Sequence, residues 1–159
     1  MQVESYLVEP QSLFVPYLAD VLGRAEMRVV RVSTTLDVDD IGRTRPEALF
    51  VDTDFLDCDP ADALSALRAV LPEALICAYT EGSGASRADR LRYAGADCVL
   101  SKRSGQHEIA EGVRVARETG GYTDPRLVLA AAEPPAPQTD EVRVAGRRRG
   151  TVRSASHST

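Results

Sequence analysis

The feature that most constrains this sequence is a repeated alternation of short apolar runs with stretches of helical periodicity. Between the apolar runs, apolar side chains recur three and four residues apart, as they do on one face of a helix. Strand–helix repeats of this kind predict a parallel sheet with helices on both faces, joined by right-handed crossovers. The predicted strands cover residues 6–8, 29–32, 48–51, 75–79 and 98–100.

Local signals mark where several of these elements begin and end. Asp59 followed by Pro60 is typical of a helix start, because aspartate caps free backbone N–H groups and proline fits the first turn. Gly95 is typical of a helix end. The run at 48–51 is continuous rather than alternating, which indicates a strand buried on both faces. The predicted helices cover residues 13–22, 37–44, 60–71, 85–94 and 104–119.

Composition divides the 159 residues into a domain and a tail. Apolar residues make up 43% of the chain and aromatic residues 5%, so we expect an aliphatic core within residues 1–130. Residues 131–159 contain several prolines, three consecutive arginines at 147–149 and a serine-rich end. A segment with few apolar residues and no periodicity cannot bury a core, so we expect a disordered tail.

Cysteine usage and the absence of long apolar runs bear on the cellular compartment. Cys58, Cys77 and Cys98 are odd in number and have no C-x-x-C spacing, so neither a disulfide framework nor a zinc site is expected. The N-terminus lacks the pattern of a signal peptide, and no apolar run approaches the roughly 20 residues of a membrane span. We therefore expect a cytoplasmic protein that does not engage membranes.

Polar side chains follow four of the five predicted strands. Glu9 follows the first strand, Asp52 and Asp54 the third, Thr80 the fourth and Lys102 the fifth. The carboxyl ends of parallel strands meet at one edge of a sheet, where ligands bind in open α/β folds. Carboxylates there invite a hard divalent cation such as Mg²⁺. A carboxylate can also attack phosphorus, with a hydroxyl and an ammonium neutralising the phosphoryl oxygens.

Lys102 is the only lysine among 19 basic residues. One interpretation is a requirement for a compact point charge, which arginine with its broad planar group does not supply. The other is chance, since a single lysine in an arginine-rich composition must fall somewhere. The residue alone does not decide between them.

Residues 5–117 together resemble the receiver domains of two-component response regulators. The segment PEALFVD at 46–52 resembles their third strand, which ends on the phosphorylated aspartate. Thr80 stands where they place a serine or threonine that contacts the phosphoryl group. The stretch AGAD at 94–97, followed by Lys102, resembles their AGAD stretch and the lysine that follows it. Residues 120–127 resemble the linker of regulators with a helix-turn-helix output domain.

The resemblance implies a flavodoxin-like (βα)5 doubly wound sheet with strand order 2-1-3-4-5. It implies a signalling domain rather than an enzyme, with a histidine kinase as donor and a downstream protein or a second copy as target. Asp52 would accept the phosphoryl group, and Thr80 and Lys102 would contact it. Mg²⁺ would bind weakly to Glu9, Asp52 and the backbone carbonyl of Asp54. Val99 would occupy the switch position.

Four positions depart from the receiver pattern. Pro10 replaces the second acid after the first strand and removes one candidate metal ligand. Glu81 adds bulk and negative charge where a small residue is usual. Val99 replaces the aromatic residue that turns inward on activation, and Arg103 replaces a proline. The side chain of Asp54 is interpreted as a surface carboxylate, although it could compensate for the acid lost at Pro10.

These departures keep a second function open, that of a pseudo-receiver which binds partners without being phosphorylated. DNA binding by the tail is a weaker alternative. The tail has five arginines but no aromatic interleaving and no folded reader, and the whole chain carries a net charge of −5. A flavin-binding protein is also disfavoured, because no phosphate-binding loop rich in serine, threonine or glycine follows the first strand.

Overall fold

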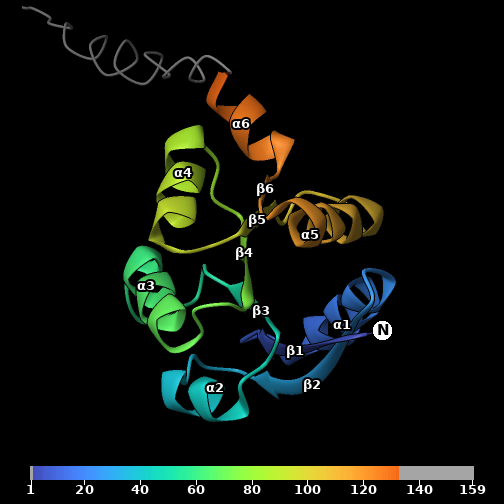
Figure 1. Cartoon of the computed structure of the whole chain (residues 1–159). Helices are drawn as coiled ribbons and strands as arrows, with labels where there is room; N and C mark the ends of the chain where they lie inside the picture. Colours follow the sequence, from blue (N-terminus) through green and yellow to red (C-terminus); the bar gives the residue numbers. More distant parts are fainter. Residues whose placement is uncertain (1, 133–159) are drawn as a thin grey trace, which may run out of the picture.

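Six parallel strands form the central sheet of the computed structural model, which describes residues 2–132 (Figure 1). The predicted order 2-1-3-4-5 and the flavodoxin-like α/β class are confirmed, and a sixth strand extends the order to 2-1-3-4-5-6. That edge strand was not predicted, because it is two residues long and no apolar run marks it. The strands are β1 (Val3–Val8), β2 (Met27–Ser33), β3 (Ala48–Asp52), β4 (Leu75–Thr80), β5 (Cys98–Ser101) and β6 (Tyr122–Thr123).

Helices cover both faces of the sheet (Figure 1). On one face lie α1 (Val15–Arg24), preceded by the short 3-10 helix η1 (Ser12–Phe14), and α5 (Gln106–Thr119). On the other face lie α2 (Val38–Thr44), α3 (Pro60–Val70) and α4 (Ala85–Ala94). A last helix, α6 (Pro125–Ala132), contacts α4 and β5 beyond the edge of the sheet. No helix within residues 2–132 is both long and apolar enough to cross a membrane.

Two apolar cores lie on either side of the sheet, and β3 serves both. Leu49 and Val51 belong to the core under α2, α3 and α4, whereas Ala48 and Phe50 belong to the core under α1 and α5. Successive side chains of a strand point to opposite faces. The side chains from Ala48 to Val51 are therefore apolar toward both faces, which explains the continuous run in the sequence.

Side-chain caps begin two of the three helices on the second face, and the one at Asp59 was predicted from the sequence. The Asp59 carboxylate accepts the Ala61 N–H at the start of α3, with Pro60 in the first position. Asp37 accepts the Asp40 N–H at the start of α2 in the same way. Gly95 ends α4 with a φ of 133°, a backbone conformation that favours glycine. Helix positions were therefore predictable from local chemistry.

Residues 122–132 add a strand and a helix to the domain, where the sequence analysis expected no further element. Asp124 is 3% exposed. Its carboxylate accepts hydrogen bonds from the N–H groups of Ser101 (3.0 Å) and Arg126 (2.9 Å) and from the Ser104 hydroxyl (2.5 Å). Leu127 enters the core beside α4. The helix runs to Ala132, past the boundary expected at residue 130, and residues 133–159 of the expected tail lie outside the described residues.

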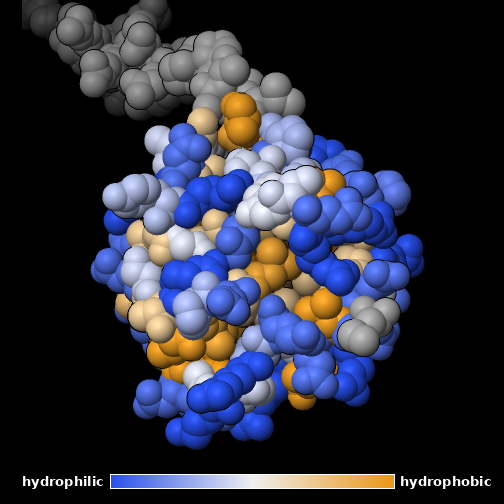
Figure 2. Space-filling model, viewed as in Figure 1, coloured by the Kyte–Doolittle hydropathy of each residue, from blue (hydrophilic) through white to orange (hydrophobic). Residues whose placement is uncertain are grey.

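The surface of the domain is mostly hydrophilic in the view of Figure 2, with apolar side chains in a few separate areas. Among the described residues, the large exposed apolar side chains include Leu13, Phe14 and Phe55. Phe14 and Phe55 both line the pocket at the carboxyl ends of the strands. Glu9, Asp52 and Lys102, three of the polar residues singled out by the sequence, line the same pocket.

Candidate functional site

The polar residues that follow the strands come together at one edge of the sheet. Glu9 follows β1, Asp52 ends β3, Thr80 ends β4 and Lys102 follows β5. Glu9, Asp52 and Thr80 are each no more than 2% exposed. Buried polar groups of this kind need partners, because an unpaired charge away from water is costly. The partners they find define the site.

Lys102 is the centre of this cluster. Its ammonium nitrogen lies 2.9 Å from Oδ1 and 2.8 Å from Oδ2 of Asp52, so it contacts both oxygens of that buried carboxylate. The same nitrogen lies 2.8 Å from Oδ2 of Asp54. It also lies 4.9 Å from the ring centre of Phe55 and 5.6 Å from that of Tyr79, within cation–π range. One ammonium therefore pairs with two carboxylates.

The Asp54 side chain points into the site, and its interpretation as a surface carboxylate is wrong. The Thr80 hydroxyl donates to its Oδ1 at 3.0 Å, and the Glu81 N–H donates to its Oδ2 at 2.8 Å. The side chain is 18% exposed. The Asp54 N–H donates to Oδ1 of Asp52 at 3.0 Å, which turns the chain back over the site. Aspartate commonly binds the backbone two residues on, so the D-x-D spacing was the signal for this turn.

Glu9 is the buried acid most affected by its surroundings. Burial disfavours its charged form, and the nearby Asp52 carboxylate acts in the same direction. These effects outweigh the N–H of Gln11, which donates to Oε1 at 3.0 Å, and raise the pKa of Glu9 to about 7. Near neutral pH, Glu9 therefore adds only part of a negative charge to the site.

Lys102 and Asp54 stabilise each other's charges. Burial opposes the charge of Lys102, but its hydrogen bonds to Asp52 and Asp54 outweigh this and raise its pKa. Burial likewise opposes the charge of Asp54, but the Lys102 ammonium, the Glu81 N–H and the Thr80 hydroxyl hold its pKa below the usual value. Both groups are therefore charged near neutral pH, although both side chains are largely buried.

A pocket of about 290 Å³ opens from this cluster to the surface. Glu81 lies at its exposed rim, and its carboxylate is 3.6 Å from Nε of Arg103. The negative charge of Glu81 at the mouth of the pocket therefore has the Arg103 guanidinium beside it. Arg103 is the residue that replaces the usual proline. The pocket is lined by Glu9, Gln11, Phe14, Tyr17, Leu18, Asp52, Phe55, Tyr79, Glu81 and Lys102.

The oxygen atoms that would ligate Mg²⁺ are not arranged as the predicted magnesium site requires. Mg²⁺ takes oxygen ligands in nearly octahedral geometry. Both oxygens of Asp52 face the Lys102 ammonium, and Oε1 of Glu9 accepts a backbone N–H. Within residues 2–132, no group of three or more His, Cys, Asp or Glu side chains is placed to hold one metal ion. The physical reason is that the Lys102 ammonium already pairs with both oxygens of Asp52, the carboxylate at the centre of the predicted metal site.

Val99, the predicted switch position, is fully buried in the core beside α4. Its carbonyl accepts the Asp124 N–H at 2.9 Å, and Val99 pairs with Thr123 of β6. A small branched side chain held between two strands has no equivalent of an aromatic ring that rotates between core and surface. The rings of Phe55 and Tyr79 also flank Lys102, and no motif in the sequence identified these two residues.

No protein-family model matches the sequence, and no curated protein matches it either. Solved structures do resemble the fold. One is a two-component response regulator of the LuxR family from Aurantimonas sp. SI85-9A1, with a TM-score of 0.70, 19% identity, and coverage of 91% of this chain and 99% of that one. Another is the signal receiver domain of the response regulator NarL from Mycobacterium tuberculosis, with a TM-score of 0.65, 19% identity, and coverage of 74% and 98%.

A third neighbour is a response regulator from Burkholderia pseudomallei, with a TM-score of 0.60, 17% identity, and coverage of 93% of this chain and 74% of that one. Its structure holds a phosphorylated aspartic acid, a calcium ion and citrate. At these identities the likeness establishes the fold. This chain has the fold of response-regulator receiver domains, with its charged cluster at the carboxyl ends of the strands.

Proposed function

We propose that this chain is a phosphorelay receiver in which Asp52 accepts a phosphoryl group from a histidine kinase and relays the signal to a protein partner or a second copy. The contact of the Lys102 ammonium with both oxygens of the buried Asp52 carboxylate carries the proposal. The receiver fold supports it, since one structural neighbour contains a phosphorylated aspartic acid. Thr80 ends the adjacent strand and supplies a hydroxyl beside the ammonium.

The chemistry is a transfer between two nucleophiles. A carboxylate oxygen of Asp52 attacks the phosphorus of a phosphohistidine on the kinase. The new P–O bond forms as the P–N bond breaks, and the imidazole leaves with the electron pair and takes a proton from water. Positioning and charge neutralisation supply most of the catalysis in phosphoryl transfer. Lys102 and Thr80 are the side chains that would neutralise the developing charge on the phosphoryl oxygens.

Incubation with a small phosphodonor tests the proposal. Phosphoramidate, added with and without Mg²⁺, is expected to add one phosphoryl mass to the intact protein. The Asp52→Asn variant should lose this gain, because an amide oxygen is a poor nucleophile. The exposed Asp57 supplies the matched control, since Asp57→Asn removes a carboxylate outside the pocket and should label normally. Full labelling of Asp52→Asn would assign the acceptor to another residue.

A pseudo-receiver that binds partners without phosphorylation is the second candidate. The contacts of Asp54 favour it, because its carboxylate already engages Thr80, Glu81 and Lys102. Under this function, neither the natural protein nor any Asp54 variant would gain phosphoryl mass from the donor, and Asp52→Asn would leave partner binding intact.

A further inference from the structure

Three donors from two neighbouring loops converge on the carboxylate of Asp54. They are the Thr80 hydroxyl (3.0 Å) and the Glu81 N–H (2.8 Å) at the end of β4, and the Lys102 ammonium (2.8 Å) after β5. The Arg87 guanidinium lies farther off, at 3.7 Å. A hydroxyl, an amide and an ammonium aimed at one point form a set suited to the oxygens of an anion.

In this arrangement, the donors have no free protons with which to bind a further anion. The Lys102 ammonium has three protons, and the structure pairs it with two oxygens of Asp52 and one of Asp54. The Thr80 hydroxyl has one proton, which it directs to Asp54, while its oxygen accepts the Gly82 N–H at 3.0 Å. A phosphoryl group on Asp52 would need the same hydroxyl and the same ammonium. The Asp54 carboxylate therefore occupies the donors that would neutralise the phosphoryl oxygens.

The backbone holds Asp54 in this place. Oδ1 of Asp52 accepts the Asp54 N–H, so the acceptor residue itself closes the turn that carries the second carboxylate over the site. The neighbouring N–H of Thr53 donates to the Tyr79 carbonyl at 3.0 Å, which ties the same turn to β4. The internal carboxylate is thus positioned by the elements that surround the acceptor.

We propose that the Asp54 carboxylate is an internal substitute for the phosphoryl group. It occupies the hydroxyl, amide and ammonium that a phosphoryl group on Asp52 would engage, and it holds the loops after β4 and β5 together in the unmodified protein. This rests on the proposed function as far as Asp52 is the acceptor. Phosphorylation then requires Asp54 to leave its three donors, so the carboxylate slows labelling and supplies a basal state in which the loops are already joined.

Two measurements on the full chain test this, with Asp54→Ala as the variant and Asp57→Ala as the control. The first is the rate at which phosphoramidate labels Asp52. Asp54→Ala should label at least about tenfold faster, because hydrogen bonds to charged groups are each strong enough to change a population by about that factor. The second is the NMR spectrum of the unlabelled protein. The amides of Glu81 and Gly82 should shift and exchange faster in Asp54→Ala and stay unchanged in Asp57→Ala.

The two measurements separate this inference from the proposed function. Faster labelling together with altered amides supports both. Equal labelling rates, or unchanged Glu81 and Gly82 amides, overturn the role of Asp54. If neither protein gains mass, the proposed function fails, and the amides alone then decide whether Asp54 joins the loops. Asp54→Asn repeats both measurements should the alanine variant fail to fold, since it keeps the shape of the side chain and removes its charge.

Discussion

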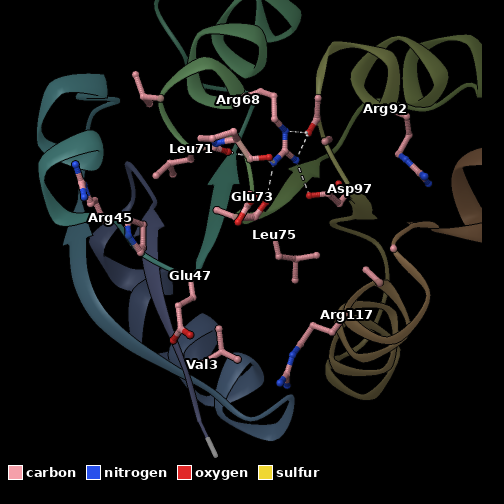
Figure 3. Close-up of a pocket in the computed structure, with 18 residues that line it drawn as sticks. Val3, Arg45, Glu47, Arg68, Leu71, Glu73, Leu75, Arg92, Asp97 and Arg117 are labelled. Carbon is pink, nitrogen blue, oxygen red and sulfur yellow. Dashed lines mark hydrogen bonds and ion pairs between the residues drawn. The ribbon is translucent and has the colours of Figure 1, made fainter.

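The two ends of the sheet each hold a partly buried cation, and they use it differently. At the carboxyl ends, the Lys102 ammonium contacts the carboxylates of Asp52 and Asp54, and within the described residues it donates to no backbone carbonyl. At the amino ends, Arg68 of α3 donates mainly to backbone carbonyls and to one carboxylate (Figure 3). The groups that accept from Arg68 are the carbonyls of Leu71, Pro72, Ala74 and Gly95 and the carboxylate of Asp97.

This difference separates a structural clamp from a chemical site. Backbone carbonyls neither titrate nor rotate independently of the chain. By binding them, Arg68 fixes the turn after α3 to the end of α4. The Asp97 carboxylate also accepts the Ile76 N–H at 2.9 Å, which joins that clamp to β4. Carboxylates on side chains can rotate, titrate or react. A cation shared between two of them, as at Lys102, leaves the arrangement open to change by chemistry.

The largest expected effect on stability is at the clamp. Arg68→Ala should lower the free energy of unfolding by about 2–4 kcal/mol, because several carbonyls and the Asp97 carboxylate lose the guanidinium that donates to them. Urea denaturation measures this. Arg90→Ala is the control, since that arginine pairs with Asp59 on the surface and is expected to cost no more than about 1 kcal/mol. If Arg68→Ala lowers the free energy of unfolding no more than Arg90→Ala does, the distinction between the two ends of the sheet is wrong.

The next effect is a pH dependence confined to the site. The pKa of Glu9 is raised from 4.5 to about 7 in the folded state, so the folded protein binds the proton more tightly than the unfolded chain. Stability from this group is complete below about pH 4.5 and is lost as the pH rises to about 7, by about 1–3 kcal/mol. Urea titrations in EDTA should show this fall.

Glu9→Gln should flatten the decline between pH 5 and pH 7, because the amide does not titrate. The exposed Glu111 offers a matched control, and Glu111→Gln should retain the decline of the natural protein. An identical fall in the Glu9 variant would mean that another buried group titrates in this window.

The smallest expected effect on stability comes from Lys102→Ala. The loss of its contacts should lower the free energy of unfolding by about 1–2 kcal/mol, less than at Arg68, because Asp54 can rotate toward solvent once the ammonium is gone. Labelling of Asp52 should fall at least about tenfold at the same time, since one charge-stabilising group is lost. Arg43→Ala removes an exposed cation on α2, outside the pocket, and should change neither quantity. Loss of stability without loss of labelling would make Lys102 a clamp like Arg68.

The fold was largely predictable because its signals are local. Each of the first five strands is an apolar run long enough to stand out, and Asp59 with Pro60 marks a helix start by its own hydrogen-bonding chemistry. The strand β6 and the helix α6 escaped prediction. Tyr122 and Thr123 form a strand only because β5 lies beside them, and Asp124 caps the following helix while bonding to the loop after β5.

The sequence alone determined which polar residues come together, namely Glu9, Asp52, Thr80 and Lys102. The carboxyl ends of parallel strands lie at one edge of the sheet whatever the details of packing. The direction of the Asp54 side chain was not. It depends on a turn closed by the Asp52 carboxylate and on donors supplied by two strands distant in the chain. Which oxygen faces which proton is a matter of a few ångströms, and only the tertiary structure sets distances on that scale.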